Sequence, residues 1–230
     1  MNTEFSCLAA AGEMLPDHVG ASFACDVAGI EAGLATLAGV VLATQGEARA
    51  AALLEAGAAR VFVGGAALAD CGVVERLAAR FGTARVGVYV AARRMEVGWS
   101  FETVSNADFK VVTPSLCEPC WEILRADGSR SGTQVHWWLG EMIKRGASAA
   151  LVRVDLRDDA DLNLCAGLVE DLGARLWLGP LDDTAPALAD WVAYGKLARI
   201  VLPPALFALR DGLLPAPATE SEPSSTMEAA

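Results

Sequence analysis

The chain has 230 residues, 53% of them hydrophobic, and a formal net charge of −11. This length suits one large α/β domain, and the acidic charge disfavours nucleic acid as a partner because its phosphates would be repelled. No apolar run reaches the roughly 20 residues that span a bilayer, and the first residues lack the basic region of a signal peptide, so we expect a cytoplasmic protein that does not bind membranes.

Short apolar segments alternate with amphipathic segments along most of the chain. The predicted strands are Glu4–Leu8, Gly39–Ala43, Arg60–Val63, Arg85–Val90, Ala149–Asp155, Arg175–Leu178 and Arg199–Leu202. The predicted helices are Val27–Leu37, Glu47–Ala56, Ala69–Phe81, Gln134–Arg145, Asp161–Leu172, Ala185–Tyr194 and Ala205–Leu213. Because parallel strands joined by helices need right-handed crossovers, the pattern predicts one α/β domain of the TIM-type (βα)8 class over residues 1–214, in which the first and last strands pair.

The front of this predicted barrel is short, because only 38 residues precede Gly39, where two complete βα units would be needed. Either the second strand is a short piece at Ser22–Cys25, or one unit is missing. The segment Met95–Cys120 is an insertion after the fourth or fifth strand, and it contains the β-prone runs WSFETV and FKVVT. Residues 215–230 are rich in Pro, Ser and Glu, so we expect a disordered tail.

Two segments carry a family resemblance. They are GEARAAALLEAGAARVFVGGAALADCGVVERLAARFG, residues 46–82, and WEILRADGSRSGTQVHWWLGEMIKRGASAALVRVDLRDD, residues 121–159. The chain resembles the histidine-biosynthesis βα-barrels, namely phosphoribosylformimino-aminoimidazole carboxamide ribotide isomerase and the cyclase subunit of imidazole glycerol phosphate synthase. The resemblance implies a ribulose-phosphate-binding type of barrel, with isomerase or lyase chemistry at the carboxyl ends of the strands.

The carboxylates that move protons in this family are only partly retained. The family Asp after the first strand corresponds to Ala9, and another family Asp corresponds to Ala91. The family run Asp-Arg-Asp-Gly corresponds to residues 156–159, which keeps one acid as Asp158. Two hypotheses stay open: a barrel with lost or altered catalysis that binds a small phosphorylated metabolite or a protein partner, and an active isomerase or lyase that uses Asp158.

Phosphate binding in the family uses glycine-rich turns, and the resemblance makes Gly64, Gly65 and Gly179 the candidate phosphate contacts. A glycine pair that ends a strand is also a common structural turn. After Gly179, Pro180 removes a backbone donor, and Asp182 and Asp183 add negative charge, both of which disfavour phosphate there.

Three other features of the sequence bear on cofactors and partners. Cys117 and Cys120 have the spacing of a redox or zinc pair, but no second paired element accompanies them, so we expect neither a metal nor another cofactor. His136 is expected to serve packing or an interface. Trp137 and Trp138 are ~100° apart on a helix, so one of them is a candidate contact for a protein partner or a second copy of the chain.

Overall fold

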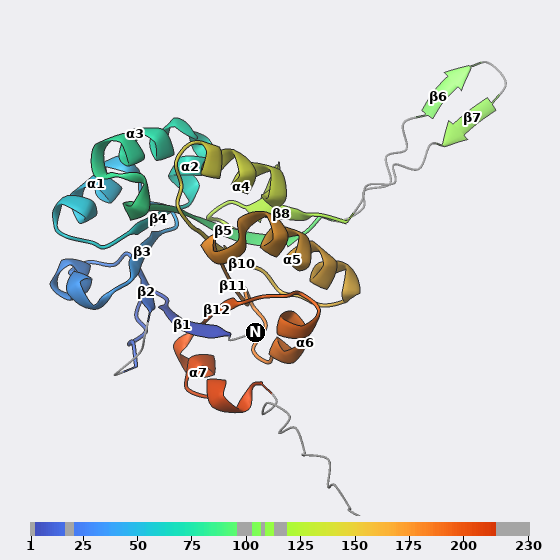
Figure 1. The fold of residues 1–230 in the computed structure, drawn as a ribbon. Coiled ribbons are helices and arrows are strands. Elements are labelled where there is room, and N and C mark those ends of the chain that lie inside the picture. The colour runs from blue at the N-terminus through green and yellow to red at the C-terminus, as the bar shows by residue number, and fades with distance from the viewer. Residues whose placement is uncertain (1–2, 17–20, 96–102, 107–108, 113–118, 215–230) are drawn as a thin grey trace, which may run out of the picture.

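The computed structural model describes residues 3–16, 21–95, 103–106, 109–112 and 119–214 (Figure 1). The predicted disordered tail and Cys117 lie outside these residues. No helix in the described part of the chain has the length and apolar character needed to cross a membrane.

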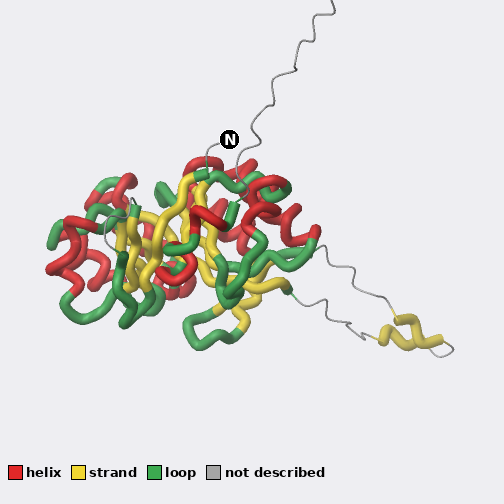
Figure 2. Tube along the Cα trace, turned by 90° about the horizontal axis from the view of Figure 1, so that it is seen from below, coloured by secondary structure: helices red, strands yellow, loops and turns green. Residues whose placement is uncertain are grey.

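Eight parallel strands close into a TIM-type barrel. They are β1 (Glu4–Ala9), β2 (Ser22–Cys25), β3 (Gly39–Leu42), β4 (Val61–Val63), β5 (Val86–Arg94), β10 (Ala150–Arg153), β11 (Leu176–Gly179) and β12 (Arg199–Leu202). The predicted closure is confirmed, since β1 pairs in parallel with β12, with Glu4 opposite Arg199. β5 pairs with β10 on the other side of the insertion. Figure 2 shows the strands at the centre of the molecule with helices around them.

The helices of the described residues are α1 (Glu47–Glu55), α2 (Gly65–Ala69), α3 (Gly72–Phe81), α4 (Val135–Lys144), α5 (Asp159–Leu172), α6 (Leu188–Ala193) and α7 (Pro204–Phe207), with 3-10 turns η1 (Ile30–Thr36), η2 (Thr83–Arg85), η3 (Gly173–Arg175) and η4 (Arg210–Gly212). Six of these helices follow the predicted order, most of them with shorter bounds; α5 begins two residues earlier than predicted, and α2 is additional. The predicted helix at Ala69–Phe81 begins three residues later, because Asp70 takes an extended conformation and its carboxylate accepts a hydrogen bond from the Gly72 N–H.

The barrel is complete in strands but short of helices at its front. The second strand is the short piece Ser22–Cys25, and no helix occurs in the described residues between β1 and β2. The helix predicted at Val27–Leu37 is instead η1, which begins after Gly29 at φ 84° and contains Gly33. Glycine favours non-helical backbone, which explains why a full α-helix does not form there.

The insertion follows the fifth barrel strand. β8 (Trp121–Leu124) pairs antiparallel with the end of β5, and β9 (Arg130–Gln134) pairs antiparallel with β8. β6 (Thr103–Asn106) and β7 (Phe109–Val112) pair with each other. The β8–β9 hairpin therefore extends β5 beyond the barrel and adds a wall to one side of its mouth.

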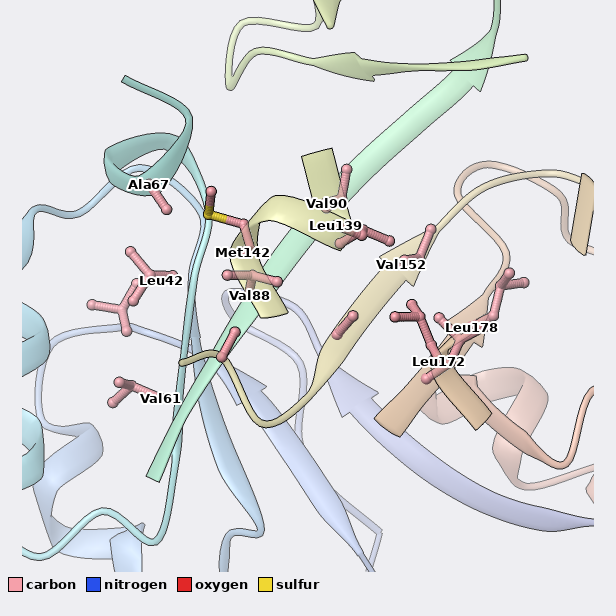
Figure 3. Close-up of a cluster of buried hydrophobic side chains, with 14 of the residues drawn as sticks. Leu42, Val61, Ala67, Val88, Val90, Leu139, Met142, Val152, Leu172 and Leu178 are labelled. Carbon is pink, nitrogen blue, oxygen red and sulfur yellow. The ribbon is translucent and has the colours of Figure 1, made fainter. Parts of the chain in front are cut away.

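The barrel wall separates two apolar layers. Outside it, strand side chains such as Val88, Val90 and Val152 face helices, with Leu139 and Met142 of α4 among their neighbours (Figure 3). Inside, one cluster fills the barrel: Leu8, Phe23, Val41, Phe62, Ala149, Leu151, Trp177 and Val201. Within it the Phe23, Phe62 and Trp177 rings meet edge to face, with centroids 5.4 to 6.3 Å apart. Aromatic bulk thus fills the barrel where other positions are glycine.

Two glycines make room inside the barrel for different reasons. A Cβ on Gly87 would lie 2.7 Å from the Phe62 ring, whereas a Cβ on Gly179 would lie 2.0 Å from the Val201 carbonyl oxygen. The first neighbour is a side chain, and the second is backbone of the adjacent strand. Gly87 therefore makes room for the bulky Phe62 ring, whereas Gly179 allows two strands to approach each other closely.

These contacts predict different responses to alanine. Gly87→Ala should cost about 1–3 kcal/mol of unfolding free energy by overpacking, and Phe62→Leu should relieve part of that cost because the ring is the obstacle. Gly179→Ala should be more damaging, with no relief from Phe62→Leu. Urea denaturation of the single and double variants measures this. Strictly additive effects of Gly87→Ala and Phe62→Leu would contradict it.

Candidate functional site

A cavity of about 280 Å³ opens at the carboxyl ends of β3, β4 and β5, beneath the turn of the β8–β9 hairpin. Its lining includes Thr44, Gly64, Gly65, Leu68, Tyr89, Ala91, Arg93, Ile123, Arg125, Trp138 and Asp182. A neighbouring hollow shares Gly65, Leu68 and Arg125 with it. Active sites of TIM barrels lie at this end of the strands, so this mouth cavity is the candidate site.

The mouth cavity has an apolar body and a charged rim. Leu68, Ile123 and Trp138 supply apolar surface, while Arg93 is held by Asp182 through a 2.6 Å ion pair. Arg125 is exposed on the hairpin turn, where its guanidinium contacts the Arg130 carbonyl oxygen. A small molecule with a hydrophobic part and an anionic group fits this combination.

Tyr89 lines the mouth cavity and also packs against the cluster inside the barrel. Burial raises the pKa of Tyr89, and the nearby Arg153 guanidinium opposes that rise. The phenol is therefore protonated at neutral pH. It can donate a hydrogen bond to a ligand.

The Gly64–Gly65 pair lines the cavity, but its N–H groups already have partners. Gly64 N–H donates to the Leu42 carbonyl oxygen and Gly65 N–H to the Ala43 carbonyl oxygen, both at 2.9 Å. A Cβ on Gly65 would lie 3.0 Å from that Ala43 oxygen. The pair therefore lets β3 and β4 end close together. This geometry favours the interpretation of the motif as a structural turn over its interpretation as an anion-binding loop.

Gly179 ends β11 and sits against the backbone of Val201. Its carbonyl oxygen accepts a hydrogen bond from the Val154 N–H at 2.9 Å. Among the described residues, Gly179 does not line the mouth cavity together with Gly64 and Gly65. Gly179 thus lies apart from the Gly64–Gly65 pair, as the resemblance implies for turns that follow different strands.

The loop after Gly179 has an anion of its own. One carboxylate oxygen of Asp155, Oδ1, accepts hydrogen bonds from the N–H groups of Leu181, Asp182 and Asp183 at 2.8, 3.0 and 3.0 Å. Successive N–H groups aimed at one oxygen form a backbone nest, the arrangement that binds phosphate in other proteins. In this chain the nest holds an internal carboxylate.

Asp158 caps α5 rather than lining the mouth cavity. Its Oδ1 accepts hydrogen bonds from the N–H groups of Ala160 and Asp161 at 2.9 and 3.2 Å, and both of its oxygens pair with the Arg94 guanidinium. These hydrogen bonds, the one from Arg94 first, hold the pKa of Asp158 well below its usual range. Such a carboxylate stays ionised and is a weak base, which disfavours it as a proton shuttle.

Asp161 is a buried acid that the sequence did not single out. Its Oδ1 accepts from Trp121 Nε1 at 2.8 Å and from Arg94 Nε at 3.1 Å, and its Oδ2 accepts from the Arg157 N–H at 2.9 Å. The side chain is 3% exposed. It therefore ties the β8–β9 hairpin and the end of β5 to the start of α5. An acid at the first residue of a predicted helix gives no signal of this role.

Ala9 and Ala91, which correspond to Asp in the family that the chain resembles, face different sides of the barrel wall. Leu8 lies in the interior cluster. Because successive side chains of a strand point to opposite faces, Ala9 points away from the interior, and Ala10 is the next position on the interior side. Ala91 follows Tyr89 on the interior row and lines the mouth cavity. No carboxylate stands at any of these three positions.

Arginines gather at the carboxyl ends of the strands and on the hairpin, although the chain is acidic overall. They are Arg93, Arg94, Arg125, Arg130, Arg153 and Arg157. Arg153 lies on the interior row of β10 and donates to the carbonyl oxygens of Pro180 and Leu181 at 2.9 and 2.7 Å. The sequence showed only the Arg93–Arg94 pair as a run, because the other arginines meet through the fold.

The remaining candidates lie on the outside. Trp138 is buried and Trp137 is 63% exposed, so one of the two faces solvent as predicted. His136 pairs with Asp171 of α5 on the surface. No group of three His, Cys, Asp or Glu side chains in the described segments is placed to hold a metal ion.

The role of Asp158 predicts a pH-dependent stability effect. Its folded-state pKa is lowered, so the ion pair stabilises the fold above the ordinary Asp pKa of about 4, and this stabilisation is lost as the pH falls. Asp158→Asn keeps a capping side chain but loses the charge, whereas Asp158→Ala loses both. Thermal melting at pH 7 should rank wild type above Asn above Ala. A gap between wild type and Asn that is equally large at pH 3 would contradict the linkage.

Comparisons with known proteins add no relative. No protein-family model matches the chain. No curated protein is significantly similar to it. The likeness to the histidine-biosynthesis barrels therefore rests on the residues quoted above and on the barrel fold.

Proposed function

We propose that this chain is a divergent relative of the histidine-biosynthesis barrels that binds a small phosphorylated metabolite in the mouth cavity without the family's proton transfer. The observation that supports this proposal is which charged groups at the mouth are already bound within the protein and which line the cavity. Carboxylates there accept hydrogen bonds from the fold, as Asp155 and Asp161 do, while guanidinium groups face the space. Arginine is well suited to bind an oxyanion but not to move a proton near pH 7.

The expected binding mode uses the cavity as described. The phosphoryl group would meet Arg125 on the hairpin turn and Arg93 on β5, and the rest of the ligand would lie over Leu68, Ile123 and Trp138. The Tyr89 hydroxyl supplies a donor for a ligand oxygen. Because Arg125 is exposed and on a turn, it can change its contact partner without disturbing the barrel.

Ligand binding can be followed through Trp138, which lines the cavity. Ribulose 5-phosphate should change the intrinsic fluorescence, and Arg125→Gln should weaken its binding by roughly tenfold or more, the typical loss for a hydrogen bond to a charged group. Arg80→Gln, an exposed arginine on α3, is the matched control.

Unphosphorylated ribulose should bind much more weakly, and Trp138→Phe should remove most of the signal. Equal affinity of wild type and Arg125→Gln for ribulose 5-phosphate would contradict the proposed site. Conversion of the family's aminoimidazole ribonucleotide at ordinary enzyme rates, on the order of 1 to 10³ s⁻¹, would instead support the alternative of an active isomerase or lyase that uses Asp158.

A protein partner or a second copy of the chain is a further candidate, favoured by the exposed Trp137 ring on α4. Exposed tryptophan is enriched at binding interfaces. If α4 is such a surface, Trp137→Ala should weaken association in sedimentation velocity experiments, while Tyr194→Ala, which removes another exposed aromatic, should not. Wild-type protein that sediments as a monomer at all concentrations would argue against association between copies.

A further inference from the structure

A second cavity, of about 460 Å³, lies beyond the end of β5 and is separate from the mouth cavity. Its lining residues are Arg93, Arg94, Met95, Arg130, Asp155, Arg157 and Asp161. The arginines come from three parts of the fold: the end of β5, the start of β9, and the loop between β10 and α5. The two cavities have Arg93 in common.

Most oxygens of the acids in this second cavity are hydrogen-bonded within the protein, and Oδ2 of Asp155 lies 3.6 Å from the Arg157 guanidinium. Asp155 and Asp161 side chains are 8% and 3% exposed. Oδ1 of Asp155 already accepts three backbone N–H groups, and both oxygens of Asp161 accept from Trp121, Arg94 or the Arg157 N–H. These carboxylates therefore stabilise the walls of the cavity and face it with their hydrogen bonds largely made.

Two of the arginines, Arg93 and Arg157, have donors to spare. Arg157 has a side chain that is 74% exposed, and its nearest carboxylate oxygen, on Asp155, is 3.6 Å away, beyond a normal hydrogen bond. Arg93 holds Asp182 through one nitrogen of its guanidinium. Since a guanidinium carries five N–H donors, Arg93 and Arg157 together can offer several to an incoming anion.

We infer that this second cavity binds the phosphoryl group of a small phosphate compound, in addition to the ligand of the mouth cavity. A carboxylate is satisfied by one guanidinium fork, whereas a phosphoryl group presents three oxygens and up to two charges, which suits arginines that converge from separate elements. The site depends on the fold, because Arg93 and Arg157 are 64 positions apart in the sequence and meet only through the β5–β10 pairing.

Isothermal titration calorimetry on the full chain tests this site with three probes: inorganic phosphate, pyrophosphate and glycerol 3-phosphate. Wild type should bind at least one of them, and Arg157→Gln should weaken that binding by roughly tenfold or more. Arg157→Lys should give an intermediate loss, because it keeps the charge without the fork. Binding of inorganic phosphate identifies the phosphoryl group alone as sufficient, whereas binding of glycerol 3-phosphate only identifies an ester as the source.

Two controls separate this site from general charge and from the mouth cavity. Arg76→Gln removes an exposed arginine on α3 and should bind the three probes as wild type does. Arg125→Gln removes the mouth-cavity arginine, so it should keep the part of the binding that Arg157→Gln loses. No binding of any probe to wild type, or equal binding by wild type and Arg157→Gln, would overturn the inference. An equal loss in Arg76→Gln would also overturn it, since the effect would then be net charge. Arg93 lines both cavities, so the two sites are distinguished by their other arginines: the mouth ligand depends on Arg125, and the second cavity depends on Arg157.

Discussion

The hydrogen bonds from three backbone N–H groups to the Asp155 carboxylate determine the conformation of one side of this barrel's mouth. They fix the loop after β11 and fill the backbone nest that could otherwise bind a phosphate. The fixed loop then presents the carbonyl oxygens of Pro180 and Leu181 to Arg153. It also places Asp182 against Arg93. A single carboxylate thereby orders one side of the mouth from within the chain.

Asp161 plays the equivalent part on the neighbouring side. It joins Trp121 of the hairpin to Arg94 of β5 and to the backbone at Arg157, and Asp158 completes the same group through Arg94. A buried carboxylate is stable only when its oxygens are paired, so removing any donor here would leave a costly unpaired charge. These acids therefore hold loops, and the ligand sites proposed above rely on arginines.

Much of the fold could be predicted from the sequence, because strand and helix periodicity are local. The order of the confidently predicted strands, the pairing of β1 with β12 and an insertion after the fourth or fifth strand followed from that pattern. The N-terminal part of the barrel was harder to predict, because Gly29 and Gly33 favour a 3-10 turn where a helix was expected. The site was accessible only in part. Gly64 and Gly65 do line the mouth cavity, but their N–H groups bond to Leu42 and Ala43, a non-local contact that no spacing reveals.

Asp155 holds the loop after β11 in the place of an external anion. Hydrogen–deuterium exchange of the Leu181, Asp182 and Asp183 amides tests this role of Asp155. In the wild type these amides should exchange slowly. In Asp155→Ala they should exchange much faster, with slow exchange partly restored by added inorganic phosphate, while Asp155→Asn, which keeps an acceptor oxygen, should lie between. Equally fast exchange in wild type and Asp155→Ala would contradict the account.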